Sequence, residues 1–552
     1  MDTRHFAFWP KRLTKELYYP QVPLFSLLET STKYYPNKTA ICYYGKEIQY
    51  SELGESILSL AAALNKIGVD KGDRVALCMQ NTPHFVISYF GIMRANAVVV
   101  PVNPMLLGDE LAFLFRDSGA EVVITSEDLL PKVQEAGKTV SIKEIIVADY
   151  KDYLPEKEIL PVPDFLKANY AITENVTRFN DILTASAQPP PVEVGVNDLC
   201  MLPYTSGSTG KPKGCMHNHY TVISNLVSAY HWFNYTSKSV VLSALPLFHV
   251  TGLIHCLLAP IYAGSEIVIL TRWDRETALS AIEQKNCTHW VNISTMVVDL
   301  LASPNIDQRD LSSLMAIGGG GAPLPRAVGE KLKNLTGLDY VEGYGLTETI
   351  SQTHFNPPDR PKLQCIGIPD FGVDARIINV DSGEELPPNS EGELIINGPE
   401  VFTGYWNRPE EDKETFIEID GKAFFKTGDV CFKDEEGYYF IVDRTKRMIN
   451  AAGFKVWPAE VENHLYKHKD ILETCVVGVP HPKKTEEIRA YIVLKEEAKG
   501  KVKEEEIINW AKEQMAAYKY PREIIFIEAL PKSGTGKILW KQLQNQARQE
   551  SN

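Results

Sequence analysis

The feature that most restricts the fold is an alternation between short, wholly apolar runs and longer segments with helical periodicity. In residues 51–67, leucine and isoleucine recur at helical spacing, with Ser51 as the expected N-cap and Gly68 as the expected stop. The apolar runs expected to be strands lie at residues 74–79, 97–103, 120–126, 240–247, 265–271, 288–294 and 314–319. Such runs, alternating with helices, are typical of a parallel sheet covered on both faces. The sequence therefore predicts an α/β fold.

The alternation falls into two blocks, separated by an irregular stretch at residues 150–197 that we expect to connect two α/β lobes. Residues 373–442 change to short alternating strands between glycine, proline and aspartate, which predicts a small antiparallel β-barrel. The last segment, of about 110 residues, is mixed in character and large enough for a domain. We therefore expect an N-terminal domain at residues 1–443, of two α/β lobes plus the barrel, and a smaller α+β domain at residues 444–552.

Composition excludes several kinds of partner. The chain has 57 basic and 71 acidic side chains and a net charge of −14, which argues against a general nucleic-acid binder and against electrostatic docking on anionic lipid. No run approaches the roughly 20 apolar residues that span a bilayer, so no integral membrane association is expected. The aromatic cluster of Phe6, Phe8 and Trp9 should pack against the body. Nine scattered cysteines without metal spacing indicate reduced thiols and a cytoplasmic protein.

The most specific motif is YTSGSTGKPKG, at residues 204–214. Glycines let the backbone turn its N–H groups toward one point, while hydroxyls and ammonium groups add further donors, so the loop suits a polyphosphate. It is not a Walker A loop, because Lys211 is followed by proline. A flexible connector is disfavoured, since it would not need fixed lysines and a proline. The residues that we assign to phosphate are Thr205, Ser206, Gly207, Ser208, Thr209, Gly210, Lys211 and Lys213.

Three further stretches follow expected strands. His249, in LPLFHVTG, could border a ligand or be a hydrogen-bonded structural histidine, and the residues alone favour the structural interpretation. The glycine run at residues 316–325 lies at a strand end, where α/β folds usually bind ligands. It leads to VEGYGLTET, in which Tyr344 offers a flat face for a base and Glu348 offers a carboxylate for a hard cation.

The C-terminal third adds three shorter motifs. Asp429, in KTGD, can accept both hydroxyls of a ribose, and Arg444 can reach the same sugar or a phosphate. Lys537 stands in the glycine-rich stretch PKSGTGKI. On its own, this lysine is either an exposed tail residue or a catalytic cation that a moving loop delivers.

Taken together and in this order, the motifs resemble those of the adenylate-forming superfamily, which includes acyl-CoA synthetases, adenylation domains of peptide synthetases and beetle luciferases. The motifs that carry the resemblance are residues 204–214, GYGLTE at 343–348, TGD at 427–429, DRTK at 443–446 and PKSGTGK at 531–537. The resemblance covers about residues 25 to 545. It implies an enzyme that uses ATP to activate a carboxylic acid as an acyl-adenylate and then transfers the acyl group to coenzyme A. It also implies a mobile C-terminal domain with its hinge at Lys446.

The resemblance assigns roles to individual residues. Catalytic roles fall to Lys537, Glu348 and His249, and Mg²⁺ would be held by Thr205 and Glu348. The remaining ATP-binding positions are Gly320, Gly321, Ala322, Tyr344, Gly345, Thr347, Asp429 and Arg444. Coenzyme A would contact Gly453, Phe454 and Lys455. The acyl pocket would include His249, Thr251, Gly319 and Gly345.

The acid substrate is predicted by comparison with subfamilies. Amino-acid-activating relatives have an aspartate near residue 249, whereas residues 248–251 here contain no acid, which favours an unaminated substrate. Gly345 stands where acetate-activating relatives have tryptophan, which favours a deeper tunnel. We expect a medium- or long-chain fatty acid first and an aromatic acid second. Thr485 stands where relatives commonly have glycine before Glu486, which weakens the expectation for the coenzyme A contacts.

Other functions remain open at this stage. A luciferase-type oxidoreductase would share every ATP motif, and a free-standing adenylating enzyme would load a carrier protein instead of coenzyme A. A non-catalytic nucleotide binder is disfavoured because Lys537 and Glu348 are both present. The sequence does not decide the oligomeric state, for which a homodimer is one option.

Overall fold

The computed structural model describes residues 3–172, 175–183, 188–205, 212–451, 454–481, 485–532 and 538–550. The chain packs as two compact units. One comprises Thr3–Asp374 with Asn397–Ala423, and the other comprises Ala375–Ile396 with Phe424–Asn552. These units divide the chain differently from the predicted functional domains, whose boundary after residue 443 stays a prediction.

The first sheet of the larger unit comes from the first predicted block. Within the described ranges its strand order is β7-β6-β5-β3-β4-β8-β9, and every pairing is parallel except that of β8 with β9. The bounds are β3 Arg74–Cys78, β4 Val98–Pro101, β5 Val122–Ser126, β6 Glu144–Ala148, β7 Thr177–Arg178, β8 Leu199–Met201 and β9 His217–Asn218. The predicted parallel strands are confirmed. Because β8 and β9 follow the irregular stretch yet complete this sheet, that stretch lies within the first lobe rather than simply between two lobes.

The second sheet contains the later predicted strands. Its order, in the part of the chain that the structure describes, is β16-β15-β14-β13-β12-β10-β11-β1-β2. The bounds are β1 Thr39–Tyr43, β2 Lys46–Gln49, β10 Val240–Ser243, β11 Glu266–Ile269, β12 His289–Asn292, β13 Ala316–Gly320, β14 Tyr340–Leu346, β15 Ser351–Phe355 and β16 Ile368–Pro369. Strands β1 and β10 to β14 run parallel. The chain therefore contributes β1 to the second sheet before it builds the first.

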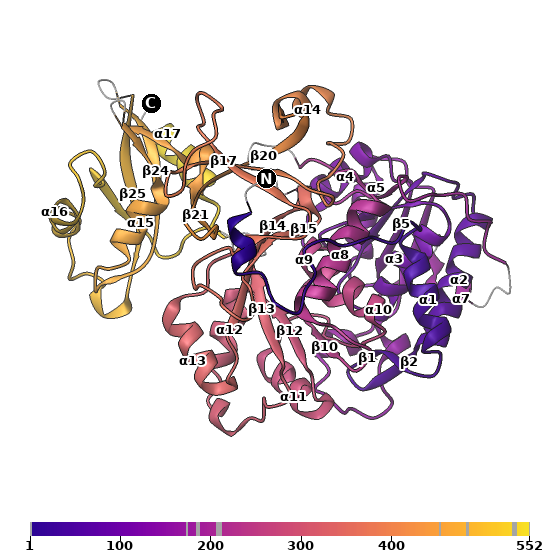
Figure 1. Cartoon of the computed structure of the whole chain (residues 1–552). Coiled ribbons are helices and arrows are strands. Elements are labelled where there is room, and N and C mark those ends of the chain that lie inside the picture. The colour runs from indigo at the N-terminus through magenta and orange to yellow at the C-terminus, as the bar shows by residue number, and fades with distance from the viewer. Residues whose placement is uncertain are drawn as a thin grey trace. The chain divides into compact units, whose positions relative to one another are not determined.

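Helices cover both faces of the second sheet. Figure 1 shows α11 (Arg275–Lys285), α12 (Ser294–Leu301) and α13 (Arg326–Thr336) on the opposite side of the strands from α8 (His219–Phe233) and α10 (Ala259–Ala263). This arrangement confirms the predicted α/β architecture. It also explains why the strands are apolar on both faces, because neither face meets water.

Helix α2 (Tyr50–Lys66) confirms the helix predicted at residues 51–67, but its expected N-cap is wrong. The helix begins one residue earlier, and Gln49 is the N-cap residue, with its backbone N–H donating to Glu52 Oε2 at 2.8 Å. Ser51 therefore lies inside the first turn. The expected stop is confirmed, since Gly68 has a φ of +87°, a left-handed conformation that glycine adopts without strain.

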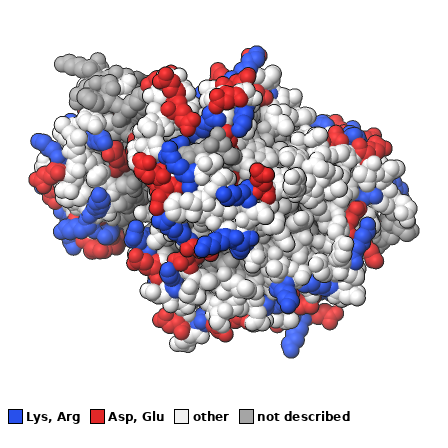
Figure 2. All heavy atoms as spheres, in the orientation of Figure 1, with Lys and Arg blue, Asp and Glu red and all other residues white. Residues whose placement is uncertain are grey.

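The N-terminal aromatic cluster packs against the larger unit, as predicted. Trp9 is buried, and its ring lies 5.2 Å from that of Trp232 and 4.9 Å from that of Phe371. The Lys15 ammonium lies over the Phe6 ring, and the Arg360 guanidinium lies over the Phe8 ring. Figure 2 shows basic and acidic side chains interspersed on the visible face of the molecule.

The antiparallel strands predicted at residues 373–442 form a five-stranded sheet, the half-barrel of this fold. The order is β17-β18-β20-β19, with β21 paired to β20. The bounds are β17 Asp374–Ile378, β18 Gly392–Asn397, β19 Phe416–Ile419, β20 Lys422–Lys433 and β21 Tyr439–Arg444. The small β-barrel predicted for this part of the chain is therefore present as a half-barrel.

The C-terminal segment has its own sheet, in the order β23-β22-β25-β24 with β26 paired to β25. Alternate residues of β25 (Thr485–Leu494) enter two cores: Ile488 and Ala490 pack in one with α15 and α16, whereas Tyr491 and Val493 pack in the other with α17. Helices on both faces confirm the α+β prediction. The bounds are β22 Ile449–Ala451, β23 Phe454–Val456, α15 Pro458–Leu465, β24 Ile471–His481, α16 Glu504–Gln514, β26 Glu523–Phe526 and α17 Trp540–Glu550.

Two further features of the structure concern membrane-spanning helices and disulfide bonds. In the described ranges, no helix combines the length and the apolar character needed to cross a lipid bilayer. All nine cysteines are buried and none is bridged to another.

Candidate active site

The second sheet gathers three of the predicted motifs along one edge. His249 follows β10, the glycine run at 318–321 lies at the end of β13, and Glu348 follows β14. Because these three strands are parallel, their carboxyl ends meet at the same edge, which is where open α/β sheets bind ligands. The topology of one sheet therefore brings these three motifs together.

Two glycines at this edge are required by close backbone approach. A Cβ on Gly319 would lie 1.9 Å from the carbonyl oxygen of Asn292, and a Cβ on Gly345 would lie 1.5 Å from that of Ser351. Both distances are far inside van der Waals contact, so any side chain would force the backbone to move. Gly345 thus has a packing reason to be glycine, beside the predicted tunnel. Gly321, Ala322 and the glycine at 345 are exposed, so the backbone there is accessible to a ligand.

His249 lies at the beginning of α9 (Val250–Leu253) with its ring exposed. Its Nδ1 accepts a weak hydrogen bond of 3.4 Å from the backbone N–H of Thr251, so the side chain caps the helix. This is the hydrogen-bonded structural role that the residues alone favoured. An exposed ring at the ligand edge can still contact a substrate, so its catalytic and acyl-pocket roles remain predictions.

The base of the predicted phosphate loop is ordered by backbone pairing. Tyr204 forms a bridge with Gly214, and the N–H of Thr205 donates to the carbonyl of Lys213 at 2.9 Å. Thr205 and Lys213 therefore lie side by side where the loop begins and ends. The six assigned residues Ser206, Gly207, Ser208, Thr209, Gly210 and Lys211 lie outside the described residues.

An aspartate that the motifs did not indicate anchors this base. Asp117, at the end of α4 (Gly108–Ser118), accepts hydrogen bonds from the Tyr204 hydroxyl at 2.8 Å and from Arg408 at 2.7 Å. Its backbone carbonyl accepts from the Trp406 indole at 3.0 Å. The loop is thus tied both to α4 and to a segment about 200 residues later in the chain.

Tyr405, in that later segment, contacts two residues that are predicted to bind the nucleotide and its metal ion. The hydroxyl of Tyr405 donates a 2.7 Å hydrogen bond to Glu348 Oε1, and Lys213 Nζ lies 4.4 Å from the centre of the Tyr405 ring. Lys213 also forms an ion pair with Glu411. Burial and the nearby Glu348 carboxylate raise the pKa of Tyr405, so its hydroxyl keeps its proton and acts as a donor.

The donor set fits the predicted Mg²⁺ site. Mg²⁺ commonly binds proteins through one or two carboxylates while substrate phosphates and waters complete its shell. Glu348 supplies one partly exposed carboxylate, and no group of three or more His, Cys, Asp or Glu that could hold a metal occurs within the described ranges. A single carboxylate beside the phosphate loop suits a cation that arrives with ATP.

Two buried residues, which the sequence motifs did not indicate, hold the ligand-binding edge of the second sheet in position. Asn81, just after β3, donates from Nδ2 to the carbonyl of Leu245 at 2.8 Å and accepts at Oδ1 from the N–H of Leu247 at 2.7 Å. His217 Nε2 donates to the carbonyl of Thr347 at 2.8 Å. Burial lowers the pKa of His217 to about 4, so its ring is neutral near pH 7. No short motif signals either contact, because each joins segments far apart in sequence.

Glu342 is a buried carboxyl group beside the glycine run. Its Oε1 accepts a 3.0 Å hydrogen bond from the backbone N–H of Leu324. Burial raises its pKa to about 7, although backbone N–H groups partly oppose this shift. The side chain fixes the turn in which Gly321 and Ala322 are exposed.

The predicted ribose ligands lie in the smaller unit. Asp429 on β20 and Arg444 on β21 are directly opposed in the antiparallel register, and Arg444 Nε lies 2.5 Å from Asp429 Oδ1. Asp429 is 2% exposed, whereas the Arg444 side chain is 43% exposed. The structure therefore brings these two residues together. Lys446 lies in a short 3-10 helix, Thr445–Arg447, that follows β21.

The remaining assignments cannot be placed. Gly453 and Lys537 lie outside the described residues. Phe454 and Lys455 contribute backbone to β23, and their side chains lie outside what is described. The same holds for the side chain of Thr485.

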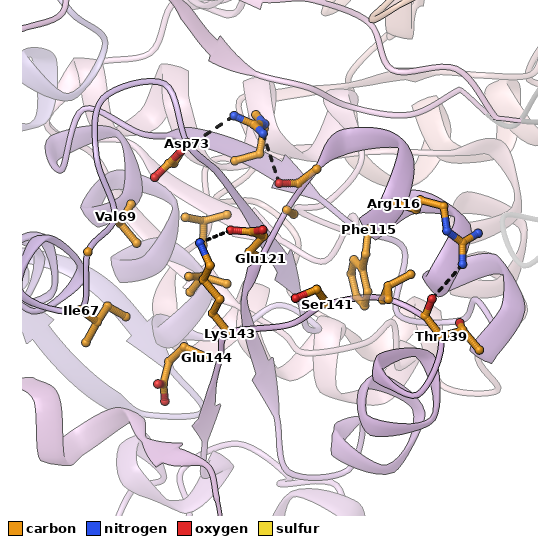
Figure 3. A pocket seen from close by; sticks show the side chains of 17 residues that line it. Ile67, Val69, Asp73, Phe115, Arg116, Glu121, Thr139, Ser141, Lys143 and Glu144 are labelled. Carbon is orange, nitrogen blue, oxygen red and sulfur yellow. Dashed lines mark hydrogen bonds and ion pairs between the residues drawn. The ribbon is translucent and has the colours of Figure 1, made fainter.

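A cavity of about 530 Å³ lies away from all of these residues, at the amino ends of β3, β5 and β6 (Figure 3). Its charged side chains already have partners: Lys143 pairs with Glu121, and Arg116 donates to the carbonyl of Thr139 at 3.2 Å. The motif residues lie instead at the carboxyl ends of the strands. The cavity is therefore separate from the candidate active site.

The chain is similar to known proteins over almost its whole length. The family of AMP-binding enzymes matches residues 28–406, and the AMP-binding enzyme C-terminal domain matches residues 460–537. A long-chain-fatty-acid–CoA ligase of Bacillus subtilis (strain 168) is 36% identical over 97% of each chain. A feruloyl-CoA synthase of Amycolatopsis sp. is 34% identical over 91% of this chain and 95% of its own. ATP-bound MatB from Rhodopseudomonas palustris superposes with a TM-score of 0.84 at 27% identity, covering 97% of this chain and 100% of that one.

Proposed function

Because this chain belongs to the AMP-binding enzymes and is an AMP-forming acid–CoA ligase, we propose that it joins a medium- or long-chain fatty acid to coenzyme A through an acyl-adenylate. Full-length similarity to the Bacillus subtilis fatty-acid ligase carries the choice of acid. The absence of an acidic residue at 248–251 supports it, since an amino-acid substrate would need a partner for its ammonium group.

The chemistry follows from what a carboxylate lacks, which is a good leaving group. A carboxylate oxygen attacks the α-phosphorus of ATP, the bond from that phosphorus to diphosphate breaks, and a mixed anhydride with AMP forms. The protein supplies positioning and charge stabilisation, so no covalent enzyme nucleophile is needed. Thr205 to Lys213 hold the β- and γ-phosphates, and Lys537 balances the charge that develops at the α-phosphate.

The other residues hold the rest of the nucleotide. Backbone at 320–322, with Tyr344, Gly345 and Thr347, receives the adenine end, and Asp429 with Arg444 receives the ribose. Mg²⁺, when bound by Glu348 and Thr205, would supply charge neutralisation at the phosphates. The contact of Tyr405 with both Glu348 and Lys213 supports this assignment, because it joins the predicted metal ligand to the predicted phosphate loop.

In the second half-reaction the sulfur of coenzyme A attacks the acyl carbon, and AMP leaves with the oxygen that came from the acid. Lys537 must withdraw so that the thiol can enter, which a rotation about Lys446 would allow. Residues 453–455 would then line the thiol channel. The C-terminal domain at 444–552 would carry all of these residues.

An aromatic acid is the second candidate. The feruloyl-CoA synthase of Amycolatopsis sp. is nearly as similar as the fatty-acid ligase, at 34% against 36% identity. We therefore propose a panel that measures diphosphate release with saturated acids of increasing length, benzoate and ferulate, each with and without coenzyme A.

The panel separates the candidates. A fatty-acid ligase should give the highest kcat/KM with medium or long chains and should form a thioester only with coenzyme A. A higher value for ferulate or benzoate would reject the fatty-acid proposal. Diphosphate release without thioester formation would point to a carrier-protein acceptor, and light emission in oxygen would point to luciferase-type oxidation.

The buried, unbridged cysteines support a reducing compartment, so we also propose that the enzyme acts in the cytoplasm.

A further inference from the structure

We infer that Tyr405 is a positioning residue for nucleotide activation, holding the Glu348 carboxylate and the Lys213 ammonium where Mg²⁺ and the ATP phosphates are received. This inference rests on the proposed role of Glu348 and Lys213. None of the sequence motifs includes Tyr405, which stands in an ordinary-looking stretch, GYWNRPE.

Backbone hydrogen bonds fix the position of Tyr405 relative to both residues. The N–H of Met216 donates to the carbonyl of Gly404 at 2.9 Å, and the N–H of Trp406 donates to that of Gly214 at 2.8 Å. On the other side, the N–H of Phe402 donates to the carbonyl of Glu348 at 2.8 Å. Residues 402–406 are therefore paired both with residues 214–216, which follow the phosphate loop, and with Glu348 itself.

The side chain of Tyr405 then makes two different contacts. Its hydroxyl donates to Glu348 Oε1, and its ring faces the Lys213 ammonium. A hydroxyl donor orients a carboxylate without neutralising it, whereas a lysine or arginine partner would compete with a metal ion for its charge. The aromatic face holds the Lys213 ammonium by a cation–π attraction. This contact also leaves the charge uncompensated, so the ammonium can still pair with phosphate.

Glu411 competes for the Lys213 ammonium, so the contact of that ammonium with the Tyr405 ring matters for ATP binding. It lies on α14 (Pro409–Thr415) and forms an ion pair with Lys213, and it lies 3.6 Å from Arg408 as well. Phosphate must draw the ammonium away from Glu411, and the neutral face of Tyr405 gives the ammonium a second site during that exchange. Removing the Glu411 charge should therefore ease ATP binding, in contrast to removing the Tyr405 hydroxyl.

A purely structural role is the alternative. The N–H of Tyr405 donates to Asp412 Oδ1 at 2.8 Å, and this bond and the backbone pairing do not need the hydroxyl. Tyr405→Phe keeps the ring and these bonds while removing only the donor to Glu348. A structural role would thus change stability alone, whereas a positioning role changes how ATP binding depends on Mg²⁺.

The test measures equilibrium ATP binding to the full chain by calorimetry at stepped Mg²⁺ concentrations, without acid or coenzyme A. Tyr405→Phe should raise the Mg²⁺ concentration for half-maximal binding about tenfold, since it removes one hydrogen bond to a charged group, and should leave Mg²⁺-free binding unchanged. Tyr50→Phe is the matched control. Tyr50 lies in α2, away from the motifs, and its hydroxyl donates a buried 2.8 Å hydrogen bond to the carbonyl of Ser265. Removing this hydroxyl should change neither the Mg²⁺ concentration for half-maximal binding nor Mg²⁺-free binding.

Glu411→Gln keeps the inference testable if Tyr405→Phe folds poorly, and a double variant tests the coupling to Glu348 if it folds. Glu411→Gln should tighten ATP binding severalfold, whereas Glu410→Gln, at an exposed neighbouring position, should not. In a Glu348→Gln background, adding Tyr405→Phe should cause no further Mg²⁺ shift, because Tyr405 acts through Glu348.

The outcomes separate this inference from the function on which it rests. Wild-type ATP binding with an unchanged Mg²⁺ dependence in folded Tyr405→Phe would overturn the positioning role alone. Independent, additive shifts in the double variant, or weaker ATP binding in Glu411→Gln, would also overturn it. Failure of the wild-type chain to bind ATP at any Mg²⁺ concentration would overturn both proposals.

Discussion

Glu348 and Asp429 are two carboxylates assigned to the same nucleotide, and the protein holds them by different partners. Glu348 receives a neutral hydroxyl from Tyr405, whereas Asp429 forms a direct ion pair with Arg444. A carboxylate that must bind a cation gains from a partner that leaves its charge uncompensated. A carboxylate that must accept two ribose hydroxyls can be paired in advance, because hydroxyls are neutral donors. The different partners thus support the ligand that we propose for each carboxylate, Mg²⁺ for Glu348 and ribose for Asp429.

The two arrangements also differ in how the chain builds them. Asp429 and Arg444 face each other on adjacent strands, so a local register places them. Glu348, Lys213 and Tyr405 come from three distant segments that long-range backbone pairing brings together. The first arrangement is visible in short motifs, and the second depends on the tertiary fold.

The largest effect should come from Lys537, which lies outside the described residues. Lys537→Ala should reduce adenylate formation about 10²–10³-fold, because it removes the cation that we propose to balance charge at the α-phosphate. Thioester formation from preformed acyl-adenylate should survive, and rapid-quench assays of the two half-reactions can measure both rates. Equal loss in both half-reactions would show that Lys537 is not specific to adenylation.

Glu342, a buried carboxyl group that accepts hydrogen bonds from backbone N–H groups, sharpens the comparison. The pKa of Glu342 is raised by burial to about 7, so the folded protein binds its proton more tightly than the unfolded chain does. Its contribution to the free energy of unfolding is therefore greatest below about pH 4.5 and falls as pH rises toward 7. Glu342→Gln mimics the protonated form and should be more stable than wild type at pH 8, by up to about 3 kcal/mol.

Denaturant unfolding at pH 5, 6, 7 and 8 measures this difference. The exposed Glu330→Gln, on α13, is the control and should follow the wild-type curve. A constant difference between Glu342→Gln and wild type across this range would show that Glu342 does not titrate there.

A smaller effect should come from Asp429. Asp429→Asn removes the charge that faces Arg444 and weakens acceptance of the ribose hydroxyls. We expect about a tenfold loss in the preference for ATP over 2′,3′-dideoxy-ATP, with the Mg²⁺ dependence unchanged. Steady-state KM values for both nucleotides give the preference, and exposed Asp420→Asn serves as control. If the Mg²⁺ dependence shifted instead, the division between the two carboxylates would be wrong.

Much of the fold was predictable because apolar runs and helical spacing are local. Strands β3, β5, β10 and β13 fall where the pattern places them. The pairing of β1 with β11 was missed, since no local pattern specifies a partner so far along the chain. The expected cap at Ser51 failed for a different reason: Gln49 with Glu52 supplies a less common capping pair, and Gln49 lies two residues before Ser51.

The site shows the same division. Residues in short glycine- or charge-rich motifs, such as Thr205, Glu348 and Asp429, could be named from sequence. Tyr405 and Asn81 could not, because their roles are hydrogen bonds between segments that only the folded chain brings together. Their side chains are ordinary in composition and become informative only through their partners.

The most direct test of the central claim follows an oxygen atom. The purified enzyme is given Mg²⁺, ATP, coenzyme A and a long-chain fatty acid labelled with ¹⁸O in its carboxylate, and the AMP product is analysed by mass spectrometry. Attack of the acid on the α-phosphorus predicts that each AMP carries one ¹⁸O atom and that diphosphate carries none. AMP without the label, or ADP and phosphate as products, would contradict an acyl-adenylate.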